Sequence, residues 1–386
     1  MSANFYLSSH ANLHLHPRAA LVTARLEDYR LANEQELGWI EIWSASAMQK
    51  ICKRLGLRQQ VLATAIVFFR RFYLRNSYCE TDPALVAAAC CYVAAKAEET
   101  PVHVKSAVGE AKVVFNDMGL HSFTSDNHRL AEMEFYLLEE LDFHLIVFHP
   151  YRALVQLCGR DGGPSAGGDD GRASRAGMLE MDDTALQMAW FIINDTFRCS
   201  LCLVHPPHLI ALAAIYLAFA LHPPVSAAVQ ILPPAADAAD ATAGSVSSRT
   251  RRHSTDANAA ASVGAGGAGT GPGGHTDAVS FLASLQVDSS LVLEIVQEIV
   301  ALYELWAQLE AGASASAAGA STASPAAQAM GVGGSRPGTP AARPQGPDER
   351  VVSILRRMQE QRMRDIRDER GKVSQAAAQA APRRAG

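Results

Sequence analysis

The sequence has little excess charge of either sign. Its formal net charge is −5 over 386 residues, so the chain as a whole has no strong electrostatic attraction to nucleic acid or to acidic membrane surfaces. It also lacks a long hydrophobic run, because the longest one, Leu209 to Leu221, is shorter than the ~20 residues that a helix needs to cross a bilayer. We therefore expect a soluble protein with no direct nucleic-acid partner and no membrane partner.

Catalytic motifs are missing as well. The sequence contains no glycine-rich phosphate loop, no His-Glu-x-x-His pair, no Gly-x-Ser-x-Gly elbow and no cluster of carboxylates at a strand end. These absences predict a protein that is not an enzyme and that uses no cofactor.

Cysteine and histidine are present, but not in the pattern of a metal site. Cys199 and Cys202 have the spacing of a redox or zinc pair, yet no second pair accompanies them and they follow a helix. His10, His14 and His16 could hold a metal weakly, although a solvated N-terminal segment explains them better. The seven cysteines lie mostly on apolar helical faces in a chain without a recognisable signal peptide, so we expect reduced thiols, an intracellular protein and no metal.

What the sequence does contain is an internal repeat. The stretch from Val61 to Lys96 aligns without a gap with the stretch from Ala185 to Ala220, at a constant offset of 124 positions. The matched pairs include Leu62 with Leu186, Ala65 with Ala189, Pro83 with Pro207, Leu85 with Leu209, Ala87 with Ala211 and Tyr92 with Tyr216. This self-similarity predicts two related helical units in tandem.

Apolar residues recur at three- and four-residue intervals along both units, which predicts an all-α fold. The stretch 59–75 is apolar nearly all round and is expected to form the central helix of the first unit. Asp82 and Pro83 supply an N-cap and a first-turn proline for the next helix, and Pro206 and Pro207 restart its counterpart in the second copy. The expected helices span about 40–55, 59–75, 84–97, 104–115 and 127–141, then 151–158, 181–199, 207–221, 279–285 and 289–309.

Three stretches between and after these helices are dominated by Gly, Ala, Ser and Pro: 159–177, 222–277 and 311–345. They have few large apolar residues with which to build a core, so we expect them to be disordered. The closure entropy of a flexible loop grows only logarithmically with its length, so a bundle can carry such insertions. Beyond them, apolar residues at helical spacing from Val351 to Met358 predict a charged helix, either docked or solvated.

Lys96 breaks the symmetry of the repeat, because its counterpart is Ala220. A lysine required by the fold alone would be expected in both copies, so Lys96 is the first candidate for function. The competing explanation is a cation that offsets the dipole of its helix by ~0.3–1 kcal/mol. Glu134 is the second candidate, and its competing explanation is a solvent-facing helix residue.

Around these candidates the sequence resembles the cyclin family. The stretch Ala95-Lys96-Ala97-Glu98-Glu99 is similar to the family's Lys-x-Glu-Glu element, and the stretch from Met133 to Asp142 is similar to its fifth-helix signature. Further stretches resemble the cyclin C branch, namely Leu57–Val61, Phe69–Tyr73, Phe135–Glu139, His149–Arg152, Asn194–Thr196 and the opening Asn4–His10. Cyclin H shares several of these motifs but not the opening.

The resemblance implies two tandem five-helix cyclin boxes with long disordered insertions. The N-terminal box would span residues 37–149 and the C-terminal box residues 150–310, with the insertions at about 159–177 and 222–277. Residues 1–36 would form an N-terminal segment and helix, and residues 311–386 a low-complexity tail with a charged helix at about 348–370.

The resemblance also implies a function. It suggests the regulatory, activating subunit of the cyclin-dependent kinase in the Mediator kinase module, regulating RNA polymerase II transcription in the nucleus together with other Mediator subunits. In cyclins, the residues that match Lys96 and Glu134 bind backbone groups of the kinase, and Ala97 and Glu99 belong to the same kinase-binding element. A possible groove for a Mediator subunit would involve Tyr6, Asn194 and Asp195, which stand at positions matching cyclin C; Asn194 and Asp195 also break the repeat, because they match Arg70 and Arg71.

The sequence departs from the family at three places. Ala97 stands where relatives usually have a larger apolar residue, and Tyr6 stands where the branch generally has tryptophan. The docking patch of cell-cycle cyclins is missing around residues 37–40.

Two alternatives remain open. A direct DNA-binding factor of the transcription factor IIB type would need a zinc ribbon and a strongly basic second repeat, and neither is present in this sequence. A kinase-independent Mediator scaffold would fail to restore activity to an isolated kinase.

Overall fold

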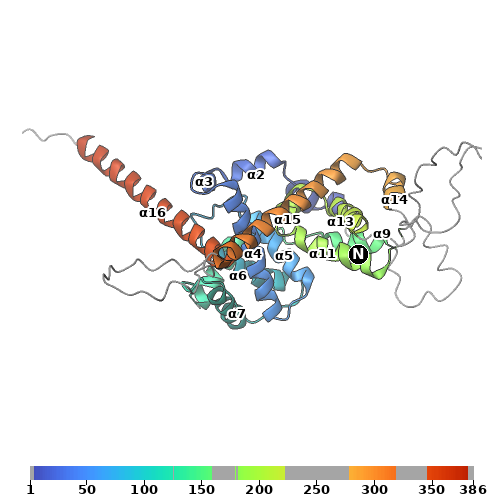
Figure 1. Ribbon diagram of the computed structural model, residues 1–386. Helices are drawn as coiled ribbons and strands as arrows, with labels where there is room; N and C mark the ends of the chain where they lie inside the picture. Colours follow the sequence, from blue (N-terminus) through green and yellow to red (C-terminus); the bar gives the residue numbers. More distant parts are fainter. Residues whose placement is uncertain are drawn as a thin grey trace, which may run out of the picture.

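The computed structural model describes residues 4–124, 126–158, 179, 181–221, 278–318 and 346–380. The secondary-structure elements within these ranges form an all-helical fold (Figure 1), which confirms the predicted class. Among these helices, none combines the length and apolar character needed to cross a bilayer. The insertions predicted at 159–177 and 222–277 lie outside the described residues.

The first helical unit is arranged around α6 (Pro83–Ala97). This helix contacts α4 (Glu34–Arg54), α5 (Gln59–Phe72), α7 (Val104–Asp117) and α8 (Asn127–Glu140). Most residues of α6 are alanine, valine and cysteine, whose small side chains let four neighbours approach closely. The carboxylate of Asp82 accepts a hydrogen bond from the Ala84 N–H at 3.1 Å and Pro83 occupies the first turn, as the sequence predicts.

The prediction that the helix beginning at Gln59 is the central one is wrong. Side chains of α5 are buried continuously from Val61 to Phe72, but α5 lies at the border between the two units. It contacts α4, α6 and α8 in the first unit and α12 (Leu201–Val204) in the second. A helix that is apolar all round needs cover on every side, and here the second unit supplies part of that cover.

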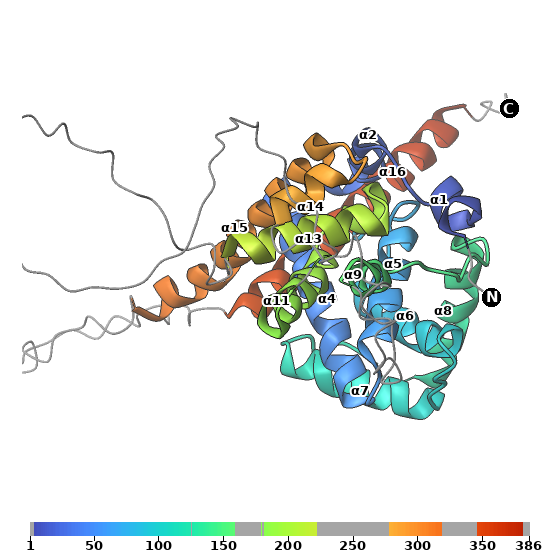
Figure 2. The same cartoon turned by 90° about the vertical axis from the view of Figure 1, so that its right-hand side faces the viewer.

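The second unit repeats this arrangement around α13 (Pro207–Leu221). This helix contacts α12 and also α9 (Pro150–Leu157), α11 (Asp183–Thr196), α14 (Ala278–Ser284) and α15 (Ser289–Ala318), which lie around it in Figure 2. When the ends of α5 and α6 are displaced by the repeat offset of 124 positions, they coincide with the ends of α11 and α13. The structure therefore confirms the predicted tandem of related helical units.

The N-terminal segment forms four short helices that contact both units: η1 (Phe5–Leu7), α1 (Ser9–Leu13), α2 (Arg18–Ala24) and α3 (Leu26–Tyr29). The expectation that the histidines here are solvated is wrong, because His10 and His14 are buried. The His10 Nδ1 accepts a hydrogen bond from the Phe148 N–H at 3.1 Å, and the His14 Nε2 lies 3.2 Å from the His144 Nδ1. The partners are more than a hundred positions away in the sequence, so local patterns do not reveal this burial.

Both C-terminal helices run past their predicted ends. Helix α15 continues to Ala318, so residues 311–318, expected to be disordered, are helical; their composition is rich in alanine, the strongest helix former. Helix α16 spans Pro347–Ala380, longer than the predicted 348–370. Its first turns dock through the predicted apolar residues from Val351 to Met358, which are buried, and the rest of the helix extends away from the body (Figure 1).

The two units pack directly on each other. The indole N–H of Trp39 in α4 donates to the carbonyl oxygen of Leu305 in α15 at 3.3 Å. The same helices approach so closely at Gly38 that a Cβ there would lie 2.5 Å from the Leu305 Cδ2. On α5, the Arg70 Nη2 donates to the carbonyl oxygen of Phe197 at 3.3 Å. These contacts fix the position of the second unit against α4 and α5.

Candidate functional site

Lys96 lies in the last turn of α6, where the helix ends in a Schellman arrangement. The Thr100 N–H donates to the Ala95 carbonyl oxygen at 2.8 Å, and the Glu99 N–H donates to the Lys96 carbonyl oxygen at 3.2 Å. Glu99 has a φ of 55°, in the left-handed region that this motif usually fills with glycine. These backbone hydrogen bonds fix the end of α6 and thereby the position of the Lys96 side chain in its last turn.

Glu134 meets Lys96 from the neighbouring helix α8. The Lys96 Nζ forms an ion pair with the Glu134 Oε1, and the same ammonium lies 4.3 Å from the centroid of the Tyr92 ring. The Lys96 side chain is 40% exposed and that of Glu134 is 17% exposed. The structure thus brings the two first-ranked residues together at the surface, while their role toward a partner stays a prediction.

The other two predicted residues lie in the turn beside this ion pair. Ala97 is partly buried against the core, and Glu99 is exposed. Between them, the Glu98 carboxylate accepts hydrogen bonds from the Gln60 Nε2 at 2.7 Å and the Thr64 Oγ1 at 2.6 Å. Glu98 therefore ties the turn after α6 to α5, a positioning contact that sequence reasoning missed.

Four large apolar side chains on α8 and the segment after it are exposed: Phe135, Tyr136, Phe143 and Ile146. Phe143 also has a left-handed φ of 57°, which is rare and strained for a bulky residue. Sequence reasoning missed these residues because it followed only the buried stripe of α8. The available signal was that Phe135 and Tyr136 lie off that stripe, and exposed apolar side chains near one another often mark an interaction surface.

Two residues of the second predicted site lie together. Asn194 and Asp195 line a small hollow between α11 and the helices α4 and α5. The Asn194 Oδ1 accepts a hydrogen bond from the Tyr151 hydroxyl at 2.7 Å, and the Asp195 Oδ2 accepts one from the Tyr303 hydroxyl at 3.1 Å. Burial raises the pKa of the Asp195 carboxyl, although Arg198 and Tyr303 lower it in part.

Tyr6, the third residue predicted for that groove, does not line the hollow. It lies in η1, where its ring centroid is 6.1 Å from that of His208 and 5.4 Å from that of Phe5. In Figure 2, α1, which directly follows η1 in the sequence, lies at the right-hand side of the body, while α11 lies toward the left. The structure therefore does not bring Tyr6 together with Asn194 and Asp195.

The described residues contain one cluster with metal-ligand chemistry, formed by His205, Glu294 and Glu298. The guanidinium of Arg18 pairs with both carboxylates, at 2.8 Å from the Glu294 Oε1. Arg18 thus supplies the positive charge that the acidic pair requires. The Cys199 and Cys202 thiols do not join it, and burial raises their pKa to about 12 and about 11, which is typical of packed, reduced cysteines.

Comparison with known proteins identifies the family. Residues 42–146 match the family model of the cyclin N-terminal domain. The chain is 35% identical over 368 residues to the RNA polymerase II holoenzyme cyclin-like subunit of Mycosarcoma maydis, which covers 80% of this chain and 91% of the relative.

Two further similarities extend this comparison. Cyclin-C of Rattus norvegicus is 31% identical over 311 residues, covering 79% of this chain and 85% of its own length. In a solved structure of the yeast TFIIK (Kin28/Ccl1/Tfb3) complex, one chain aligns with 77% of this chain and 99% of its own, at 20% identity and a TM-score of 0.46. The extent of the match to the Mycosarcoma maydis subunit shows that this chain belongs to the cyclin family, and its sequence is similar to cyclin C.

Proposed function

We propose that this chain is the activating, regulatory subunit of a cyclin-dependent kinase that acts in RNA polymerase II transcription. The observation that carries the proposal is the surface ion pair between Lys96, in the last turn of α6, and Glu134, in the middle of the neighbouring helix α8. The similarity to cyclin C and to an RNA polymerase II holoenzyme subunit supports the transcriptional role. The proposal includes a nuclear location, a place in the Mediator kinase module and no catalytic activity of its own.

The chemistry of the pair suits the recognition of a protein backbone. A lysine ammonium offers only hydrogen-bond donors and a carboxylate only acceptors. Lys96 can therefore bind carbonyl oxygens of the kinase while Glu134 binds its amide groups, whatever the side chains of that segment are. In the free chain the two groups satisfy each other, and an exposed pair of this kind contributes only ~0.2–1 kcal/mol. Little stability is lost when the pair exchanges its mutual contact for contacts with the kinase.

The exposed side chains Phe135, Tyr136, Phe143 and Ile146 supply apolar area next to this polar pair in the sequence. Buried aromatic anchors surrounded by polar contacts carry most of the energy in protein interfaces. Ala97 stands where relatives usually have a larger apolar residue, so these four residues are proposed to provide the apolar part of the kinase contact.

Activation then follows from differential binding. A protein kinase is active when a glutamate on its mobile helix pairs with its catalytic lysine. A subunit that binds the helix-in conformation more tightly shifts the population toward it. The cyclin needs no catalytic group for this effect, because the kinase supplies all of the chemistry.

Affinity for the kinase tests the proposal. Lys96→Ala and Glu134→Ala should each weaken binding by ~2–5 kcal/mol, on the order of 30-fold to several thousand-fold in Kd, because each leaves buried groups of the kinase unpaired. Lys50→Ala is the matched control, since Lys50 is an exposed lysine whose ion pair with Asp348 joins α4 to α16 and involves neither α6 nor α8. Circular dichroism should show unchanged helical content, and unchanged kinase affinity in both site variants refutes the proposed contact.

The same preparation separates the alternatives. The activating role predicts that the purified chain raises the activity of the isolated kinase, whereas a scaffold would bind without raising it. A DNA-binding factor would retard duplex DNA in a gel without any kinase present. Identification of co-purifying proteins also tests whether a further Mediator subunit binds at the hollow of Asn194 and Asp195. When this hollow is blocked, that subunit should no longer co-purify with the chain, while the kinase should still do so.

A further inference from the structure

Two consecutive arginines on α5 are both buried, but they differ in their partners. Arg70, which is 1% exposed, has its Nη1 at 2.7 Å from the Glu41 Oε2. Arg71, which is 3% exposed, has no ion pair to any carboxylate in the described part of the chain. Its Nη1 donates to the His144 carbonyl oxygen at 3.2 Å, while its Nε and Nη2 have no hydrogen-bond partner. A buried cation without a counter-charge is strongly unfavourable.

The fold does not require an arginine at this position. The repeat places Asp195 of α11 where α5 has Arg71, and Asp195 is bonded to Tyr303 and Arg198. The same helical position is thus compatible with the opposite charge. Arg71 therefore calls for an explanation other than the architecture of the unit.

The charge of Arg71 acts on its surroundings. Burial lowers the pKa of the Arg71 guanidinium to about 10. Burial first, and then the positive charge of Arg71, lowers the pKa of His14 to about 4 and also lowers the pKa of His16. Further positive charge is thus disfavoured around Arg71, although Asp142, which lines the same pocket, raises the pKa of His14 in part.

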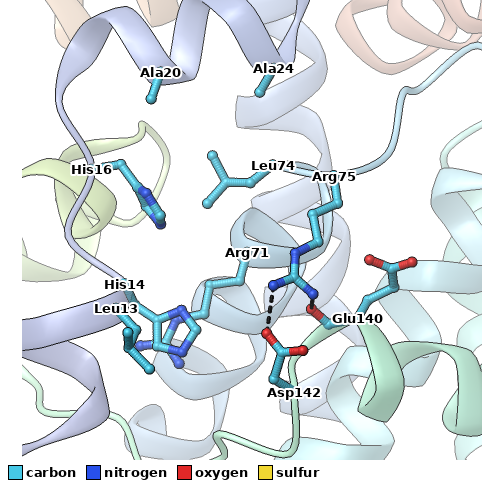
Figure 3. A pocket seen from close by; sticks show the side chains of 10 residues that line it. All are labelled: Leu13, His14, His16, Ala20, Ala24, Arg71, Leu74, Arg75, Glu140 and Asp142. Carbon is cyan, nitrogen blue, oxygen red and sulfur yellow. Dashed lines mark hydrogen bonds and ion pairs between the residues drawn. The ribbon is translucent and has the colours of Figure 1, made fainter.

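Arg71 lines a pocket between the N-terminal segment, α5 and the end of α8 (Figure 3). The pocket has a volume of about 320 Å³, roughly ten times the ~30 Å³ that one water occupies in the liquid. His14, His16 and Arg75 also line it. Arg75 is already engaged, since its Nη2 lies 2.5 Å from the Asp142 Oδ2 and its Nη1 donates to the Glu140 carbonyl oxygen at 2.9 Å.

We propose that this pocket binds a phosphate group, with Arg71 as its main counter-charge and Arg75, His14 and His16 as further donors. The planar fork of an arginine matches the oxygens of a phosphate, and charge-assisted bonds of this kind are strong. A doubly charged phosphate also suits these four side chains better than a singly charged carboxylate does. One of its negative charges balances Arg71, and the second favours the protonated form of a histidine. The phosphate is carried by a phosphorylated side chain of a partner protein or is free inorganic phosphate. This site is separate from the proposed kinase-binding pair.

Thermal unfolding of the full chain with increasing inorganic phosphate tests the site. The midpoint for the wild-type chain should rise and then saturate, because a ligand that binds only the folded state stabilises it by mass action. Phosphate also stabilises proteins without binding, by exclusion from their surface, and that part does not saturate. Arg71→Met should remove the saturable part and should be at least as stable as the wild-type chain in buffer without phosphate, since an unpaired buried charge is gone.

Two further variants keep the test decisive. Arg70→Met alters the neighbouring buried arginine outside the pocket, so it should keep the saturable rise. Arg75→Gln, at the pocket, should weaken phosphate binding by about tenfold, as expected for the loss of one charge-assisted hydrogen bond. The absence of a saturable rise in the wild-type chain, or an equal rise in Arg71→Met, overturns the proposal.

Fluorescence anisotropy with a labelled phosphoserine peptide identifies the source of the phosphate. Binding of the peptide more tightly than inorganic phosphate indicates a phosphorylated protein as the ligand, and equal affinity indicates free phosphate. Competition by inorganic phosphate places both at the same pocket. Equal binding of the unphosphorylated peptide would contradict a site for phosphate.

Discussion

Removal of the Glu41 charge should leave Arg70 as an isolated cation between the two helical units. The Arg70 Nη1 lies 2.7 Å from the Glu41 Oε2, but this nitrogen has no partner with hydrogen-bond geometry, so the attraction is mainly Coulombic. The Arg70 Nη2 keeps its bond to the Phe197 carbonyl oxygen at 3.3 Å in any Glu41 variant. The substitution Glu41→Gln preserves the size of the side chain and removes only its charge.

The expected loss follows from the burial of the two groups. Breaking a buried ion pair from one side lowers the free energy of unfolding by ~3–5 kcal/mol. Arg70 is 1% exposed but Glu41 is 18% exposed, so water screens the pair in part and we expect the lower end, about 3 kcal/mol. The ion pair of Arg54 and Glu110 is 44% and 33% exposed, and Glu110→Gln should lower the same free energy by less than ~1 kcal/mol.

Urea denaturation followed by circular dichroism measures both effects. Glu41→Gln should lower the midpoint without a change in the denaturant dependence. The double variant Glu41→Gln/Arg70→Met should recover most of the loss, because removing both partners leaves no isolated charge. A Glu41→Gln variant within ~0.5 kcal/mol of the wild-type chain, or a double variant that is less stable than Glu41→Gln alone, would refute the reasoning.

Two other variants test the backbone and the buried histidines. Glu99→Gly should raise the free energy of unfolding by about 0.5–1 kcal/mol, because glycine adopts a φ of 55° more readily than glutamate does. The urea midpoint measures this gain. An equal gain in Glu99→Ala would show that the backbone φ is not its cause. Burial holds the pKa of His149 at about 3, so the folded state keeps this group neutral while the unfolded state takes up a proton below about pH 6.5. The stability that this neutral group contributes is therefore present above pH 6.5, and the free energy of unfolding should fall by about 2 kcal/mol between pH 6.5 and pH 5. His149→Gln should reduce the dependence of the urea midpoint on pH. An unchanged dependence in this variant would show that other groups control it.

The fold was predictable where the local apolar pattern matches the faces that are buried, and it was not predictable where burial depends on contacts between distant segments. The repeat offset placed α11 and α13 correctly, because the same apolar pattern buries the same faces in both units. It did not show that α12 of the second unit packs on α5, nor that His10 and His14 are buried against residues 144–148. Composition misassigned residues 311–318, because an alanine-rich stretch that lacks core residues can still continue an existing helix.

The candidate site was predictable in part. The asymmetry of the repeat and the family resemblance both pointed to Lys96, and the structure places Glu134 against it. Glu98 and the exposed Phe143 were not found, since their positions depend on the turns that end α6 and α8. Tyr6 was expected beside Asn194 because of the family resemblance alone, and its position in η1 depends on contacts with Phe5 and His208 that no local pattern encodes.

Helix α4 is a common wall of both halves of the molecule. It packs on α5, α6 and α7 of the first unit and also on α15 and α16, and Gly38 leaves room for the Leu305 side chain of α15. The two units therefore cannot separate without exposing buried side chains of α4 to water. A kinase docked at the proposed contact with Lys96 and Glu134 would therefore meet a rigid surface, and we expect the rearrangement during activation to occur in the kinase.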